Sequence, residues 1–111
     1  MKKISEVAEE LNVSLRTLRY YDQIGLVSPE RTEGRYRMYN ESDVDRIRKI
    51  IEYRETDMPI SKITKILDDP GCNEKDVLKE HLMVLTERQE ELERYIDFTK
   101  ELIEGKESGV V

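Results

Sequence analysis

The sequence predicts a mainly α-helical chain: a small domain of short helices with one β-hairpin, followed by a single long helix. Three observations support this fold class. Cap residues bound two short apolar-periodic segments near the N-terminus, an alternating segment follows Gly34, and residues 74–104 contain neither Gly nor Pro. With 111 residues, of which 37% are hydrophobic and 40% charged, the chain has room for one compact domain with a modest core.

The first two helices are delimited by cap residues. Ser5 is expected to cap a first helix that ends at Asn12. Ser14 is expected to cap a second helix over about residues 15–24, and Gly25 supplies the left-handed residue that ends it. Two short helices separated by the residues around Asn12 have the dimensions of a helix-turn-helix.

A hairpin is predicted after the second helix. Residues 32–34 are a turn signal, and the alternation after them is typical of a strand. Arg35 and Arg37 are two residues apart and would share one face of that strand. Taken alone, the pair fits a solvated edge strand whose charges prevent aggregation. Beside a helix-turn-helix, it favours a basic wing.

Three further helices are predicted. One begins near residues 40–42 and runs to about Thr56, and a shorter one spans about residues 61–68. The last spans residues 74–104, where seam positions recur at alternating spacings of four and three, as in a coiled coil. A single helix with so narrow an apolar stripe would leave that stripe in water. We therefore expect the helix to pair with a second copy of the chain and form a homodimer. The predicted seam is Leu78, Leu82, Leu85, Gln89, Leu92, Ile96, Thr99 and Ile103.

Charge is distributed unevenly along the chain. The net charge is −6, but residues 1–40 hold seven Lys and Arg against six Asp and Glu. Arg16 and Arg19 form one local basic cluster, and Arg35 and Arg37 form another. An acidic average is therefore compatible with nucleic-acid binding, which needs a basic footprint on one face only.

The second helix carries a face rich in hydrogen-bond donors. A helical wheel places Arg16, Thr17 and Tyr20 away from the first helix, with Arg19 and Tyr21 on the flanks. Arginine can reach guanine or phosphate, and hydroxyls suit backbone oxygens. A packing alternative stays open: one tyrosine, more readily Tyr21, would close the small core, and the arginines would pair with neighbouring carboxylates.

Other function classes are disfavoured by composition. Cys72 is the one cysteine, which rules out an internal disulfide and indicates a reducing compartment. No apolar run could span a bilayer, and acidic residues interrupt the N-terminal segment where a signal peptide would be apolar, so we expect a cytoplasmic protein. The chain has no glycine-rich phosphate loop and no nucleophile elbow, so we do not expect an enzyme.

The ordered segments ISEVAEELNVSLRTLRYYDQIGL, GRYRMYNESDVDRI and PISKITKILDD resemble the MerR family of bacterial transcription regulators, in particular its Mta and TipA type. The resemblance implies a winged helix-turn-helix DNA-binding domain over residues 1–70. It also implies an antiparallel dimerisation coiled coil over residues 74–104, and a tail or truncated linker over residues 105–111. Each subunit would read half of a pseudo-palindromic promoter. The dimer would distort the spacer between the −35 and −10 elements for RNA polymerase, usually as an activator.

By match of motif, the resemblance assigns the DNA contacts to the second helix and the wing. The expected residues are Ser14, Arg16, Thr17, Arg19, Tyr20, Tyr21, Arg35, Tyr36, Arg37 and Tyr39.

The same resemblance bears on ligands. Metal-sensing members use several cysteines, whereas Cys72 and a lone His81, expected to be solvated or at the dimer interface, make a poor metal site. No metal or cofactor is therefore expected. Drug-binding members carry an effector domain after the long helix. A small-molecule effector is therefore not expected to bind this chain as it stands, and truncation before such a domain is the favoured explanation of its end.

A second function class is a coiled-coil adaptor that binds protein and not DNA. The two basic clusters distinguish the alternatives, because an adaptor has no need of them.

Overall fold

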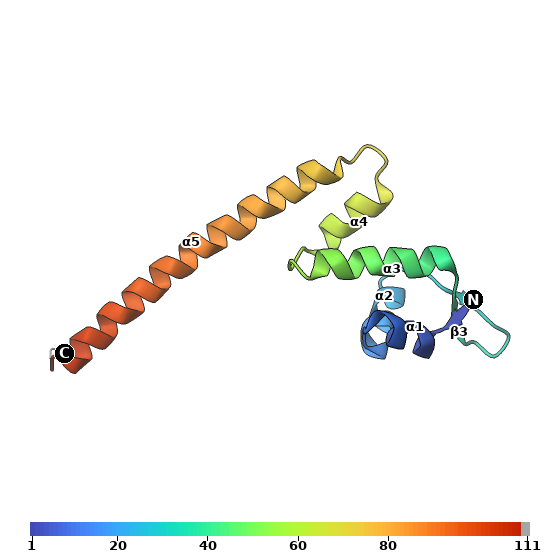
Figure 1. Cartoon of the computed structure of the whole chain (residues 1–111), viewed down its shortest axis with the longest axis horizontal. Helices are drawn as coiled ribbons and strands as arrows, with labels where there is room; N and C mark the ends of the chain where they lie inside the picture. Colours follow the sequence, from blue (N-terminus) through green and yellow to red (C-terminus); the bar gives the residue numbers. More distant parts are fainter. Residues whose placement is uncertain (110–111) are drawn as a thin grey trace. The chain divides into compact units, whose positions relative to one another are not determined.

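A computed structural model describes residues 1–109, and its mainly helical architecture confirms the predicted fold class. The chain divides into two units, of which the first is Met1–Pro70 and the second begins at Gly71. In the first unit, α3 passes between α4 and the α1–α2 pair (Figure 1). The elements are β1 (Lys2–Lys3), α1 (Ile4–Leu11), α2 (Leu15–Gln23), β2 (Glu30–Arg31), β3 (Arg37–Tyr39), α3 (Glu41–Arg54), α4 (Ile60–Asp68) and α5 (Glu74–Glu107).

Helices α1 and α2 form the predicted helix-turn-helix. Asn12 ends α1 in the left-handed conformation, with φ of 51°. Ser14 caps α2, because its hydroxyl oxygen accepts a hydrogen bond from the backbone N–H of Thr17 at 3.0 Å. The prediction that Ser5 caps α1 is wrong. The helix begins at Ile4, and the Glu6 carboxylate accepts from the backbone N–H of the cap residue before it.

Gly25 ends α2 as predicted, in the left-handed conformation with φ of 75°. Its backbone N–H donates to the carbonyl of Asp22 at 3.0 Å, and the N–H of Leu26 donates to the carbonyl of Tyr21 at 2.9 Å. These are the two hydrogen bonds of a Schellman motif. The motif turns the chain so that Leu26 enters the core beside Tyr21.

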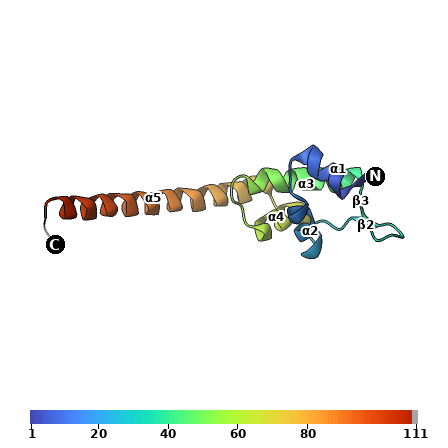
Figure 2. The same ribbon diagram turned by 90° about the horizontal axis from the view of Figure 1, so that it is seen from below.

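The strands form a three-stranded antiparallel sheet in the order β1-β3-β2. The wing is the β2–β3 hairpin, and its loop projects from the first unit (Figure 2). Strand β1, which pairs Lys2 with Tyr39, was not predicted. The strand prediction is also wrong for Arg35, which lies in the hairpin loop with φ of 64° and so does not share a strand face with Arg37.

One hydrophobic core holds the first unit together. It draws on every helix of that unit and on the inner wing strand. Among the described residues, its members are Val7, Leu18, Tyr21, Leu26, Val27, Tyr39, Val44, Ile47, Ile50, Tyr53, Met58 and Ile63.

An arginine on α3 connects three segments of the first unit. Arg46 donates from Nε to the carbonyl of Leu26 at 2.7 Å and pairs through both terminal nitrogens with Asp68, at 2.6 and 2.9 Å. Such a bidentate ion pair fixes the relative orientation of the two side chains in addition to neutralising their charges. The hydrogen bond from Arg46 holds the pKa of the Asp68 carboxyl below its usual value.

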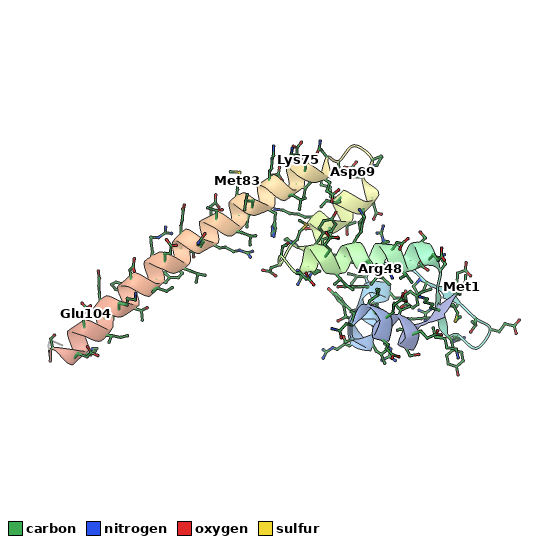
Figure 3. The ribbon with its side chains drawn as sticks, in the orientation of Figure 1. Met1, Arg48, Asp69, Lys75, Met83 and Glu104 are labelled. Carbon is green, nitrogen blue, oxygen red and sulfur yellow. The ribbon has the colours of Figure 1, made fainter. Side chains whose placement is uncertain are left out.

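Helix α5 begins where predicted and extends three residues beyond the predicted end, through Gly105 to Glu107. Asn73 caps it by accepting from the backbone N–H of Asp76 at 3.2 Å. Residues 110 and 111, the last of the predicted tail, lie outside the described residues. Val77 and His81 are buried, so the expectation of a solvated His81 is wrong. Side chains project on all sides of α5 (Figure 3).

We expect Asp68→Asn to lower the free energy of unfolding by about 0.5–1 kcal/mol, because it breaks a half-exposed ion pair with Arg46. The folded-state pKa of Asp68 is lowered, so the pair stabilises fully above about pH 5 and its contribution is lost as the pH falls through that pKa. Urea unfolding at pH 7 and pH 3 measures both effects. Glu52→Gln, an exposed change on α3, is the control; an equal loss at both pH values would contradict the assignment.

Candidate nucleic-acid interface

The outward face of α2 forms a shallow depression on the surface of the first unit. Its lining residues come from three successive turns of one helix and are Arg16, Thr17, Arg19, Tyr20 and Gln23. Both arginines are exposed, and Tyr20 is 49% exposed. Four of the predicted site residues are thus brought together on one face. Guanidinium, hydroxyl and amide groups here offer hydrogen-bond donors to an anionic or polar surface.

The start of α2 is fixed by its cap. The Ser14 hydroxyl donates to Thr17 Oγ1 at 2.8 Å while accepting from the Thr17 backbone N–H. Arg16 lies between these two residues in the first turn, where the helix dipole adds positive potential. The role of Ser14 in the structure is therefore to hold the first turn.

The two adjacent tyrosines of α2 have different roles. Their ring centroids are 6.3 Å apart and the rings are tilted by 50°. Tyr20 faces solvent, whereas Tyr21 is 6% exposed and belongs to the core. Burial raises the pKa of the Tyr21 hydroxyl. The structure thus corrects the expected DNA contact of Tyr21 and favours the packing alternative.

Tyr39 is also a core residue. It is 1% exposed, its hydroxyl is buried without a hydrogen-bond partner, and burial raises its pKa. The prediction that Tyr39 contacts DNA is wrong for this structure, since no atom of its hydroxyl reaches the surface. Tyr36, by contrast, lies in the loop before β3 and is 73% exposed.

The tip of the wing is a tight loop that presents Arg35 and Tyr36. The backbone N–H of Arg35 donates to the carbonyl of Thr32 at 2.8 Å, and the N–H of Tyr36 donates to the Thr32 hydroxyl at 3.2 Å. A Cβ at Gly34 would lie 2.9 Å from a Tyr36 ring carbon, so glycine lets the ring lie over the loop. Two hydrogen bonds thus shape the loop in which Arg35 and Tyr36 are exposed.

The base of the wing is joined to α2 through Asp22. Its Oδ2 accepts from Arg31 at 2.5 Å and from Arg37 at 2.7 Å. Sequence reasoning missed Asp22 and Arg31 as site residues. The available signal was hairpin register, because Arg31 lies opposite Arg37 across the β2–β3 ladder. In the wing, Arg31 and Arg37 pair with a carboxylate, whereas Arg16 and Arg19 are exposed on α2.

Within residues 1–109 no group of three or more His, Cys, Asp and Glu side chains is arranged to hold a metal ion. Cys72 is a partly exposed free thiol. Across the same range, no helix combines the length and apolar character needed to cross a membrane.

A helix-turn-helix flanked by a hairpin, with arginines exposed on its second helix, defines a winged helix-turn-helix of the DNA-binding class. Residues 2–69 match the family described as MerR HTH family regulatory protein, and the chain belongs to this family. The match confirms the resemblance found in the sequence and the prediction of a DNA-binding transcription regulator that is not an enzyme.

Two relatives are similar in sequence to this chain over most of its length. It is 32% identical over 108 residues to the HTH-type transcriptional activator TipA of Streptomyces coelicolor and 34% identical over 110 residues to the HTH-type transcriptional activator mta of Bacillus subtilis. Each match covers 96% of this chain and 43% of the relative. The chain therefore spans less than half the length of these relatives.

Solved structures show the same fold. The N-terminal part of the B. subtilis multidrug transporter activator, MtaN, matches with a TM-score of 0.85 and 28% identity, covering 93% of this chain and 98% of that one. EcmrR in a DNA complex matches with a TM-score of 0.86 at 17% identity, covering 99% of this chain and 41% of EcmrR, and it supports the fold alone.

We expect Tyr39→Phe to leave stability unchanged or raise it by up to about 1 kcal/mol, because it removes a buried hydroxyl that has no hydrogen-bond partner. Tyr39→Ala should cost about 3–5 kcal/mol through the cavity it leaves. Urea unfolding compares the two variants. A large loss in Tyr39→Phe would show that the hydroxyl makes a stabilising contact.

Proposed function

We propose that a homodimer of this chain binds double-stranded promoter DNA, with the outward face of α2 at the bases and the wing at the backbone. The observation that carries the proposal is the exposed set of Arg16, Arg19 and Tyr20 around the α2 depression, next to a wing that presents Arg35 and Tyr36. Between residues 14 and 37 the chain holds five arginines and three acidic residues, against the acidic average of the whole.

Each exposed group has a chemical role in this proposal. Arg16, in the first turn of α2, reaches guanine O6 and N7 or the adjacent phosphate, and Thr17 supports the same turn. Arg19 and Tyr20 contact the backbone or base edges one turn further along. Arg35, Tyr36 and Arg37 contact phosphates flanking the groove. Ser14 acts by orienting the helix start, where backbone N–H groups also favour phosphate.

The dimer is proposed to form along α5. Five of its seam residues are large apolar side chains at least 40% exposed: Leu78, Leu82, Leu92, Ile96 and Ile103. Pairing would remove this stripe from water, and an antiparallel arrangement is the one that the family resemblance implies. Two helix-turn-helix units would then read the halves of a pseudo-palindrome.

Activation by distortion of the promoter spacer is the finer part of the proposal. Two relatives, TipA and mta, are named transcriptional activators, which supports this direction of regulation. Bending and untwisting DNA between the −35 and −10 elements costs deformation energy, which contacts on both half-sites would offset. RNA polymerase on the promoter is then the functional partner, and the bacterial cytoplasm the compartment.

The first test is DNA selection. Purified chain should enrich related sequences from a random duplex library, and fluorescence anisotropy should then give a Kd. We expect Arg16→Ala to raise the Kd at least about fivefold, by loss of a contact worth about 1–3 kcal/mol. Arg94→Ala, a matched change on α5 outside the seam, should leave the Kd unchanged. A chain that enriches no DNA would favour the adaptor alternative.

Dimerisation is tested on α5 itself. Leu92→Asp places a charge in the proposed seam and should convert dimers to monomers in sedimentation experiments, with loss of DNA affinity, since a single half-site binds weakly. Met83→Asp is the matched control, because Met83, labelled on α5 in Figure 3, is 64% exposed and is not one of the proposed seam residues. A dimeric Leu92→Asp variant would refute the seam.

A further inference from the structure

We propose that Asp22 is a positioning residue for the DNA interface: it holds the wing arginines Arg31 and Arg37 in the orientation in which they meet phosphate. The inference rests on the proposed DNA-binding function. It assigns a favourable role to a carboxylate that, by charge alone, would repel DNA.

One oxygen of Asp22 connects α2 to both strands of the wing. Its Oδ2 accepts from a terminal nitrogen of Arg31 on β2 and from Nε of Arg37 on β3, at 2.5 and 2.7 Å. The side chains of Asp22 and Arg37 are 15% and 23% exposed, so their contact is better shielded than a typical surface ion pair. The carboxylate therefore fixes the wing against the helix that bears the other proposed contacts.

The two arginines need a counter-charge to occupy these positions. Arg31 and Arg37 are partners in the β2–β3 register, and like charges directly opposite one another destabilise a strand pair. Asp22 lies against both guanidinium groups. Without it, the two cations would repel each other at the base of a two-stranded hairpin, and their side chains would turn apart.

The contacts with Asp22 leave donors for a second acceptor. Arg37 uses Nε, so its two terminal nitrogens take no part in the contact. Arg31 is 45% exposed and uses one terminal nitrogen. A guanidinium has five N–H donors, so each side chain can hold Asp22 and a phosphate at once. Side chains already held in place lose less conformational freedom on binding.

An electrostatic role and a positioning role of Asp22 predict opposite changes in DNA affinity for Asp22→Asn. The variant loses one negative charge beside the DNA, so a purely electrostatic role predicts tighter binding and a steeper salt dependence. A positioning role predicts weaker binding despite the gain in positive charge. Glu33→Gln removes a charge of the same sign from the exposed loop of the same hairpin and controls for electrostatics.

The experiment uses the full chain and the duplex selected by the wild type, with Kd measured by anisotropy over a range of KCl concentrations. We expect Asp22→Asn to raise the Kd at least fivefold, and Glu33→Gln to leave it equal or lower it. In an Arg31→Gln, Arg37→Gln background, Asp22→Asn should weaken binding no further. A Kd for Asp22→Asn at or below the wild-type value, or an undiminished loss in the double-arginine background, would overturn the inference.

A second variant covers loss of folding. If thermal unfolding shows Asp22→Asn to be unfolded at the binding temperature, Asp22→Glu takes its place, because it keeps the charge and moves the carboxylate by one methylene. A fivefold higher Kd supports positioning, and an unchanged Kd overturns it. A wild-type chain that selects no DNA would refute the proposed function, whereas a wild type that binds beside a tight-binding Asp22→Asn would refute this inference alone.

Discussion

The first unit depends on the burial of a few apolar side chains from all of its helices in one core. Val7 of α1, Leu18 of α2, Ile47 of α3 and Ile63 of α4 are each at most 1% exposed. Tyr39 brings the inner wing strand into the same core. The core is small and the chain is 40% charged. Apolar packing therefore holds the helices together, and polar contacts connect the segments at the edge of the core.

Those polar contacts occur where the core ends. Arg46 joins the loop after α2 to the end of α4, and Asp22 joins α2 to the wing. Each bridges segments that are distant in the sequence, and each uses an arginine, whose planar donors can serve two acceptors. The proposed seam of α5 differs from these contacts, because most of its apolar side chains are exposed within the second unit. Such exposure is expected of a surface that binds another molecule.

The sequence predicted the parts of the fold that local chemistry determines. Asn12, Ser14 and Gly25 cap or end helices through contacts within a few residues, so their positions could be assigned without the structure. Strand β1 could not, because two residues carry no periodicity and the strand exists only through pairing with β3. The exposed face of α2 followed from helical spacing. The burial of Tyr39 and the double contact of Asp22 depend on residues 9 to 15 positions away or on the packed core, which spacing alone does not encode.

Arg35 occupies a conformation that costs an arginine about 1–2 kcal/mol relative to a glycine, because its side chain crowds the backbone at positive φ. Selection for thermal stability alone would favour Arg35→Gly at this tip. The arginine therefore costs the hairpin stability and gives a positive charge at the tip of the loop. Stability-guided redesign of this protein would therefore erode its proposed interface first at the loop tip, while the helices remained intact.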